Sequence, residues 1–547
     1  MKIRIIRIAM ISIVQMLAFF WFIGTIKYVL FWIYLWQLKG YHVGRFIDHF
    51  RTSKGKKVLF GFLPSIKLAL LLFLLVNYFF FPFVFYLLLI FYIIESLIFI
   101  SSILKKQIKK PALTFKTILL ILVSFLVVTL YLLVGYGFVD GDFAFTFYIL
   151  AFDILLPLLI SLIVLFFQPF FVLARNSILA KARGKIKKYK NLIVVGITGS
   201  YGKTSTKEFL TTILSSKFKV LATPEHKNSE IGIAQTILKD LTSDHQIFVV
   251  EMGSYNKGGI KLLCDIVKPK IGVVTGVNEQ HLATFGSLEN LLSAEGGREL
   301  LAELPQNSLL VVNGDNKYCV DLYKKAQIKK LMYTVAGDKV HSDVWAEEVV
   351  VAKDYISFVA LSHDKHMAQF SIRALGRQHI QNLLAAILVA KELGMSLGEI
   401  SEACRNIVPE QAGTTLCTGV HGINIIDSSY SSNPDGVMAD LDYLNVFDGK
   451  KVIVMPCLIE LGEKSAEVHK QIGRKIAEVC DMAIITTKDK FEEIKSGAAP
   501  GAAPPKIIFS ENPKEIFNVI TTFCKEGDAV LLEGRVPGEL VRLLSAK

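Results

Sequence analysis

Cysteine is scarce in this 547-residue chain and poorly placed for cross-linking. The seven cysteines stand at positions 264, 319, 404, 417, 457, 480 and 524, and no two of them form a CxxC pair. A disulfide framework or a cysteine-based zinc site needs paired or closely spaced thiols, so the sequence argues against both. Scattered cysteines are typical of reduced thiols that are buried as small apolar groups, and we assign no function to them.

Charge is also sparse. Charged residues make up 20% of the chain and hydrophobic residues 52%, and the mean hydropathy of +0.46 is too apolar for an ordinary soluble enzyme of this size. The excess lies before residue 175, in five apolar stretches at roughly 8–36, 59–81, 83–104, 115–138 and 143–174. Each approaches the ~20 residues that cross a bilayer, and the first is too long for a cleaved signal peptide. We therefore predict a polytopic membrane region, with Phe81 and Pro82 forming a tight turn between the second and third stretches.

The net charge of +13 does not indicate nucleic-acid binding, because many of the basic residues flank the apolar stretches. Basic segments follow the first, third and fifth stretches (39–57, 105–110 and 182–190), whereas the short connection at 139–142 reads VDGD. The positive-inside rule places the basic loops and everything after residue 190 in the cytoplasm. Five crossings would leave the basic N-terminus outside, so four crossings with a re-entrant or interfacial first segment remain an alternative. The predicted location is the plasma membrane, with cytoplasmic catalytic domains.

From residue 191 onward, short β-branched runs alternate with helical segments. Buried strands are expected at 191–198, 245–252, 270–277 and 308–315, a β-rich patch at 341–374, and a helix at 381–394. Further strands are expected at 423–429, 450–457, 482–488 and 527–534, and the low-complexity stretch 496–506 reads as a surface loop. This alternation predicts α/β domains with largely parallel sheets. We place a transmembrane region at 1–185, a P-loop ATPase domain at 186–410 and a Rossmann-like α/β domain at 411–547.

The stretch GITGSYGKTSTKEFL (196–210) has the context of a phosphate-binding loop, with a strand before it and a helix after it. Glycine-rich turns of this kind present backbone N–H groups and a positive helix end to phosphate oxygens. Lys203 is expected to reach the β- and γ-phosphates and Thr204 to hold Mg²⁺. The spelling departs from GxxxxGK(S/T), because Ile197 stands where the first glycine belongs.

The spelling TG(S/T)xGKT(S/T) resembles the Mur ligases, which join amino acids or peptides to cell-wall precursors through ATP-made acyl phosphates. Within that family the chain is most similar to the type that adds D-Ala-D-Ala. Residues 249–300, GRQHIQNLLAA (376–386), IIDSSYSSNP (425–434) and IELGEKSAEVHKQIG (459–473) resemble family blocks in order and spacing. The likeness covers about residues 190–547.

The resemblance implies roles for individual residues. It implies ATP binding by Gly199, Ser200, Gly202, Lys203, Thr204, Ser205, Asn382, Asp427 and Tyr430, Mg²⁺ binding by Thr204, Glu251 and His281, and catalysis by Lys203, His281 and Glu295. Plainer readings exist: the loop as a chance glycine-rich turn, Glu251 as a solvated acid, His281 as an ordinary polar histidine, Asn382 as a helix cap, and Asp427 and Tyr430 as turn residues. Tyr255, Asn278 and His379 are weaker candidates.

Three residues depart from the family pattern. Glu295 stands where the family usually has a carbamylated lysine; either it supplies the carboxylate directly or it is a helix-surface acid. Gln378 replaces a family histidine, and Thr414 replaces an arginine that normally helps with phosphate charge.

The N-terminal region departs further, because membrane segments occupy the place of the domain that grips the uridine nucleotide. The hypothesis is a ligase that adds an amino acid or dipeptide to a membrane- or lipid-linked wall precursor. Its partners would be a small amine donor, that acceptor and membrane lipids, without nucleic acid. The alternatives are a membrane ligase of the poly-γ-glutamate synthase kind and a non-catalytic ATP-binding scaffold. An ATP-driven transporter is disfavoured, because neither an ABC signature nor a Walker-B run is found.

Overall fold

The computed structural model describes residues 13–76, 80–105, 107–224, 227–278, 280–408, 411, 413–429, 433–499 and 505–545, except for the side chains of 53 and 54. The chain divides into two compact units, Met1–Arg175 and Asn176–Lys547. The first is entirely helical where it is described, and the second is built on two β-sheets.

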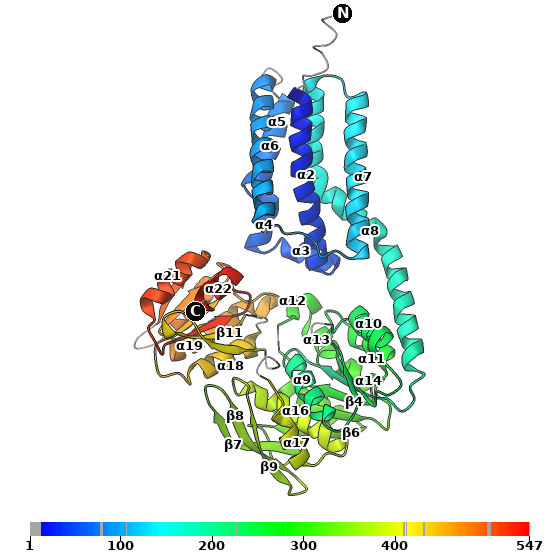
Figure 1. Ribbon diagram of the computed structural model, residues 1–547, viewed down its shortest axis with the longest axis vertical. Helices are drawn as coiled ribbons and strands as arrows, with labels where there is room; N and C mark the ends of the chain where they lie inside the picture. The colour runs from blue at the N-terminus through cyan, green and yellow to red at the C-terminus, as the bar shows by residue number, and fades with distance from the viewer. Residues whose placement is uncertain are drawn as a thin grey trace, which may run out of the picture. The chain divides into compact units, whose positions relative to one another are not determined.

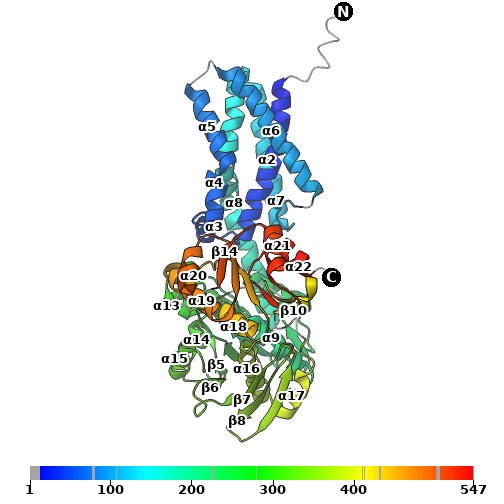
Figure 2. The same ribbon diagram turned by 90° about the vertical axis from the view of Figure 1, so that its left-hand side faces the viewer.

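Five helical segments of the first unit are long and apolar enough to cross a membrane: Ile13–Leu38, Gly55–Val76, Phe81–Leu104, Phe115–Phe138 and Asp142–Ile186. They correspond to α2 (Ile13–Leu38), α4 (Ser53–Phe60) with α5 (Phe62–Val76), α6 (Phe81–Leu104), α7 (Phe115–Phe138) and α8 (Asp142–Ile186). Figures 1 and 2 show these helices running alongside one another, with short α3 (Val43–His49) at one end. Where they are described, the five predicted stretches are thus helical, with a break at Gly61 in the second, and the last extends a further 12 residues beyond its predicted end at residue 174.

The predicted turn at Phe81 and Pro82 is wrong. Both residues belong to the first turn of α6, where proline is tolerated because the first helical N–H groups have no partner within the helix. Residues 1–12, which hold the start of the first predicted stretch, lie outside the described residues.

A buried ionic cluster joins four helices of this unit. Lys67 of α5 lies 3.1 Å from a carboxylate oxygen of Glu95 of α6, and it also pairs with Asp153 of α8. Tyr28 of α2 donates to Glu95, and Tyr92 of α6 donates to Asp153 at 3.2 Å. Among the apolar side chains around it, this cluster fixes which helices are neighbours.

The first sheet has nine strands in the order β2-β3-β1-β4-β5-β6-β7-β8-β9. In this order, each neighbouring pair from β2 to β7 is parallel. The pairs β7–β8 and β8–β9 are antiparallel. The strands are β1 (Ile193–Thr198), β2 (Val220–Ala222), β3 (Ile247–Glu251), β4 (Ile271–Val274), β5 (Leu309–Asn313), β6 (Lys329–Thr334), β7 (Val344–Val351), β8 (Ile356–Ser362) and β9 (Met367–Ile372). The predicted strands and the β-rich patch are confirmed, whereas β2 and β6 escaped prediction.

Successive residues of these strands feed two cores, one on each face of the sheet. Val195 and Val273 pack under α9 (Lys203–Ser215), α16 (Gln378–Glu392) and α17 (Leu397–Cys404). Val194 and Val274 pack on the other side, together with Leu179, Ala182 and Ile186 near the end of α8. The helices of that face are α10 (Glu230–Asp240), α11 (Gly259–Val267), α13 (Leu288–Ala294), α14 (Arg298–Glu303) and α15 (Lys317–Lys325).

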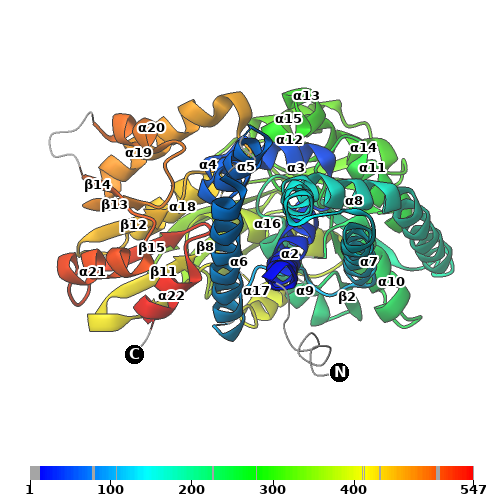
Figure 3. The ribbon, with the colours of Figure 1, turned by 90° about the horizontal axis from the view of Figure 1, so that it is seen from above.

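The second sheet has six strands in the order β10-β11-β15-β12-β13-β14, parallel except for β10. Its strands are β10 (Thr415–Thr418), β11 (Asn424–Ser428), β12 (Lys451–Met455), β13 (Met482–Ile485), β14 (Lys506–Phe509) and β15 (Ala529–Glu533). One face is covered by α18 (Pro434–Leu444), α19 (Ser465–Val479) and α20 (Phe491–Ala498), and the other by α21 (Pro513–Phe523) and α22 (Gly538–Ser545) (Figure 3). The expected surface loop at 496–506 is wrong at its ends, because residues 496–498 belong to α20 and Lys506 begins β14, whereas 500–504 lie outside the described residues.

Candidate active site

The loop between β1 and α9 requires glycine at two positions. Gly199 has φ +139° and Gly202 has φ +73°, both in the region that side chains disfavour. A Cβ atom on Gly199 would lie 2.2 Å from Thr275 Oγ1, and one on Gly202 would lie 2.3 Å from Asn382 Oδ1. Ile197, at the position of the missing glycine, is a buried residue of β1. Strand β1 therefore extends through the position where the usual motif has its first glycine.

Lys203 opens α9 and bends back over this loop. Its ammonium group donates to the carbonyl oxygen of Gly199 and lies 3.5 Å from that of Ser200. Thr204 and Ser205 follow in the first turn of α9 and are half-buried. The N-terminus of α9, the glycine loop and one ammonium group thus lie together, which is an arrangement suited to anions.

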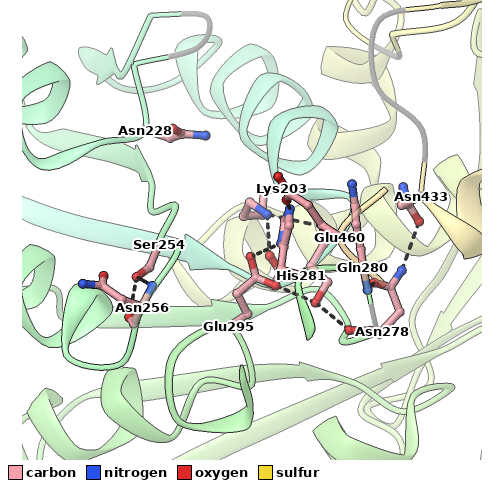
Figure 4. Close-up of polar contacts among 12 residues, drawn as sticks. Lys203, Asn228, Ser254, Asn256, Asn278, Gln280, His281, Glu295, Asn433 and Glu460 are labelled. Atoms are coloured by element: carbon pink, nitrogen blue, oxygen red, sulfur yellow. Dashed lines mark hydrogen bonds and ion pairs between the residues drawn. The ribbon is translucent and has the colours of Figure 1, made fainter. Parts of the chain in front are cut away.

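Glu295 connects the loop to His281, which directly precedes α12 (Leu282–Phe285). Ser200 Oγ donates to one oxygen of the Glu295 carboxylate at 2.8 Å, and His281 Nδ1 lies 2.9 Å from the other. Burial by itself raises the pKa of Glu295, but the hydrogen bond from His281 and the positive charge of Lys203 hold it below its usual range. Glu295 is therefore a buried carboxylate, and the alternative of a helix-surface acid is wrong. Figure 4 shows Lys203, His281 and Glu295 gathered together.

Glu251 ends β3 and is buried, so it is not the solvated acid of the plainer reading. Its carboxylate accepts from Asn228 Nδ2 at 2.9 Å and lies 3.8 Å from the ammonium group of Lys207. Lys207 is itself fully buried and also donates to the carbonyl of Thr223 at 3.0 Å. The sequence pattern did not identify Asn228 or Lys207, because neither lies next to Glu251 along the chain.

Asn382 is not a helix cap, since α16 begins at Gln378 and its N-cap residue is Arg377. Its side chain lies in the second turn, where Oδ1 is 3.5 Å from Thr206 Oγ1 and faces the loop at Gly202. The structure thus brings Asn382 to the predicted nucleotide loop.

Asp427 stands at the carboxyl end of β11 and is half-buried. Its Oδ1 accepts from the backbone N–H of Ser429 at 2.9 Å, which is the turn contact that the plainer reading predicts. Tyr430 lies outside the described residues. His379, a weak candidate, is fully enclosed in the core against Phe209, and burial lowers its pKa to about 4.

Two contacts bring the C-terminal domain to this edge of the first sheet. Asn278 Nδ2 donates to Asn433 Oδ1 at 3.1 Å and to Asp435 Oδ2 at 2.7 Å. Glu460 approaches His281 from the loop before the 3₁₀ turn Gly462–Lys464. The predicted site is therefore composite, and the sequence alone did not indicate the part played by Glu460.

The two departures at Thr414 and Gln378 converge on one buried side chain. Gln378 Nε2 donates to Asp440 Oδ1 at 3.1 Å, and Ser428 Oγ donates to the other oxygen. Thr414 Oγ1 lies 3.3 Å from that same Ser428 hydroxyl. Burial raises the pKa of Asp440. Where the family places a histidine and an arginine, this chain therefore has a buried network with neutral amide and hydroxyl donors.

Comparison with known proteins agrees with this arrangement. Residues 197–390 match the model of the Mur ligase middle domain, and residues 414–536 match that of the Mur ligase glutamate ligase domain. The chain belongs to the Mur ligase family. It is by membership an ATP-dependent carboxylate–amine ligase, and both matches begin after the helical unit.

Among curated relatives, the UDP-N-acetylmuramoyl-tripeptide–D-alanyl-D-alanine ligase of Synechocystis is 29% identical over 343 residues, covering 62% of this chain and 71% of the relative. The Bacillus subtilis enzyme of that name is 25% identical over 342 residues, covering 62% and 72%. Among solved structures, MurF ligase from Thermotoga maritima in complex with ADP has a TM-score of 0.59 at 26% identity, covering 68% of this chain and 83% of that one. MurF from Acinetobacter baumannii has a TM-score of 0.61 at 24% identity, covering 68% and 80%.

The residues present fit a nucleotide with Mg²⁺. The two loop glycines let the loop pack closely against Thr275 and Asn382, and Lys203 supplies a positive charge beside it. Among the described residues, no three His, Cys, Asp or Glu side chains form a metal site by themselves. Mg²⁺ is commonly bound through one or two carboxylates together with phosphate oxygens and water, and Glu251 is a buried carboxylate that could serve in this way.

Proposed function

We propose that this protein is a membrane-bound ligase that uses ATP to join an amine to a carboxylate of a membrane-associated cell-wall precursor. The observation that carries the proposal is the set of Lys203, Ser200, Glu295 and His281, which are linked to one another at the glycine loop. The proposed domains are a transmembrane region at 1–185, a P-loop ATPase domain at 186–410 and a Rossmann-like domain at 411–547.

In this proposal the loop holds ATP. Gly199, Ser200 and Gly202 surround the phosphates, Lys203 offsets their charge, and Asn382, Asp427 and Tyr430 contact the rest of the nucleotide. Mg²⁺, held by Thr204, Glu251 and His281, would neutralise the charge that develops during phosphoryl transfer.

Glu295 takes the place of the carbamylated lysine of the family in this scheme. Its carboxylate fixes His281 through Nδ1, while Nε2 lies 4.0 Å from Glu460 Oε2. Because Ser200 donates to the same carboxylate, the loop and His281 are held in one geometry. The acceptor carboxylate is phosphorylated first, and the amine then displaces phosphate from the acyl phosphate to give the amide. No side chain is needed as a nucleophile, since positioning and charge stabilisation account for such chemistry.

The membrane assignment rests on the five apolar helices and on the basic residues that flank them. Burial of the Lys67, Glu95 and Asp153 side chains inside the helical unit supports a folded membrane domain rather than a simple anchor. A lipid-linked acceptor needs no domain that grips a uridine nucleotide, so the helical unit would deliver the acceptor at the cytoplasmic face of the plasma membrane.

The test is phosphate release by the detergent-solubilised protein with ATP and Mg²⁺. UDP-linked and lipid-linked muropeptides would be crossed with D-Ala-D-Ala, glutamate and other amines, with Lys203→Ala as the blank. We expect release only when a lipid-linked acceptor and one amine are both present. Release with glutamate alone would indicate a polymerising ligase, and no release under any condition would indicate a non-catalytic nucleotide-binding protein.

A further inference from the structure

His281 has a carboxylate on each side of its ring, and the two come from different domains. Glu295 lies 2.9 Å from Nδ1, whereas Glu460 Oε2 lies 4.0 Å from Nε2. Figure 4 shows Glu460 beside His281, on the side opposite Glu295. The nitrogen that Glu295 leaves unoccupied thus faces an acid of the C-terminal domain.

The backbone at Glu460 adopts a conformation that side chains disfavour. Its φ is +68°, in the left-handed region, although it is not a glycine. Its carbonyl oxygen accepts from the backbone N–H of Ala283 at 3.0 Å, two residues beyond His281. Such conformations persist only where the surroundings enforce them, and they concentrate at functional sites. The loop therefore presents Glu460 to His281 at a conformational cost.

The buried side chain of His469 is hydrogen-bonded to the loop that carries Glu460. The backbone N–H of Leu458 donates to His469 Nε2 at 2.9 Å, and His469 Nδ1 lies 2.6 Å from the carbonyl oxygen of Ser465. His469 is fully buried, and Leu461 is buried beside the loop. The residues on either side of Glu460 are thus held by the core of their own domain.

Glu460 remains accessible, unlike Glu295. Its side chain is 27% exposed, whereas that of Glu295 is 3% exposed. Tyr255, which packs edge-on against the His281 ring at 5.7 Å, is 45% exposed, and Ile459 is 60% exposed. A small molecule with one cationic end and apolar groups can therefore reach this place, and the carboxylate matches the cationic end.

We propose that Glu460 binds the nitrogen of the incoming amine donor, as an ammonium before reaction. This inference rests on the proposed ligase function and specifies the amine subsite of that site. The bound ammonium first gives up one proton to solvent, which frees the lone pair on nitrogen. When that lone pair bonds to the acyl carbon, the carbon–oxygen bond to phosphate breaks and phosphate leaves with its electron pair. The second surplus proton of the nitrogen then passes to solvent. Glu460 stabilises the positive charge that the nitrogen carries in the ground state and develops as it attacks.

The subsite lies on the C-terminal domain, whereas the glycine loop lies on the central domain. The amine is therefore held at His281 only while the two domains are docked through Glu460 and Ala283. Acyl-phosphate formation does not use Glu460. A variant that has lost this charge should therefore still form the acyl phosphate but bind the amine poorly.

The experiment compares Glu460→Gln, which keeps the shape and removes the charge, with Glu463→Gln as the matched control. Glu463 is an exposed acid of the adjoining 3₁₀ turn. With D-Ala-D-Ala as the amine, we expect Glu460→Gln to raise its KM at least tenfold while the KM values for ATP and acceptor stay within twofold. Glu460→Asp, which keeps the charge, should recover part of the loss. Glu463→Gln should behave as wild type.

A second readout separates this subsite from a structural role. Positional isotope exchange in ATP, measured with acceptor but without amine, reports reversible acyl-phosphate formation, and it should be unchanged in Glu460→Gln. Unchanged amine KM in an active Glu460→Gln variant, or a parallel loss of isotope exchange, would overturn the inference alone. A wild-type protein that shows no exchange and no phosphate release with any acceptor would overturn the proposed function as well.

Discussion

Electrostatic coupling at the scale of single residues is strongest around Glu295. Its carboxylate is buried, yet its pKa stays below the usual range because His281, Lys203 and Ser200 all favour the charged form. The Glu295 carboxylate therefore orients His281, offsets the positive charge of Lys203 and is linked to the glycine loop through Ser200.

Glu295→Gln should lower ligase kcat/KM by about 10²–10³-fold, because a preorganised charge is lost from the site. Steady-state kinetics would measure this loss. Glu289→Gln, an exposed acid at the start of the same helix, is the control and should be neutral. Glu295→Lys recreates the family residue, and partial recovery on adding bicarbonate is expected. A Glu295→Gln variant with wild-type rates would contradict the assignment.

His379 makes a separate prediction about stability. Burial lowers its folded pKa to about 4, below the ordinary 6.5, so between these pH values the unfolded chain binds a proton that the folded chain does not. The stability associated with neutral His379 is fully present above pH 6.5 and is lost progressively as the pH falls toward 4. The loss amounts to about 2 kcal/mol at pH 5.

His379→Leu removes this titration. Thermal unfolding at pH 7.5 and pH 5 should show a smaller pH dependence for the variant than for wild type. His341→Gln, at an exposed histidine, should leave the wild-type difference unchanged. An identical pH dependence in His379→Leu would show that folding does not lower the pKa of His379.

At the scale of elements, the β1–α9 connection works because two glycines let the loop approach β4 and α16. Gly202→Ala would place a methyl group 2.3 Å from Asn382 Oδ1 at φ +73°, where an alanine is also strained. ATP affinity should fall at least tenfold by calorimetric titration. Gly398→Ala, on a helix with open space around it, is the control and should not weaken binding. Equal ATP affinity would mean that the loop does not hold the nucleotide.

The helical unit contains its own test at this scale. Lys67→Met leaves Glu95 and Asp153 buried without their shared cation, which should cost about 3–5 kcal/mol, as breaking buried ion pairs does. The triple variant Lys67→Met, Glu95→Gln, Asp153→Asn should recover most of this loss, because no uncompensated charge remains. Thermal stability in detergent would measure both. A single variant as stable as wild type would show that the cluster does not hold these helices together.

At the scale of the whole molecule, the proposed division of labour is that the helical unit delivers the acceptor and the α/β unit performs the chemistry. A chain starting at residue 176 keeps Leu179, Ala182 and Ile186, which pack into the core of the central domain. It should bind ATP normally and lose at least 10-fold in turnover of a lipid-linked muropeptide. Equal turnover of a soluble UDP-linked precursor by the truncated and full-length chains would reject the membrane-acceptor proposal.

Periodicity and local chemistry made much of the fold predictable. The apolar stretches predicted five helices, and the β-branched runs predicted most of the inner strands of both sheets, because each pattern matches one backbone period. The inner strand β6 and the edge strands β2, β10 and β14 are less uniformly apolar, so they carried little signal. The helix start at Phe81 was missed because proline occurs both in turns and in the first turn of a helix.

The sequence by itself determined the apolar helical region, the glycine loop with Lys203 and the family, since these depend on composition and on residues close together along the chain. Only the tertiary structure decided that Glu295 is a buried carboxylate, that Thr414 and Gln378 converge on Asp440, and that Glu460 reaches His281. These relations join residues 14 to 179 positions apart, some of them in different domains. Burial and pairing depend on packing between such segments, and no local pattern records which segments will meet.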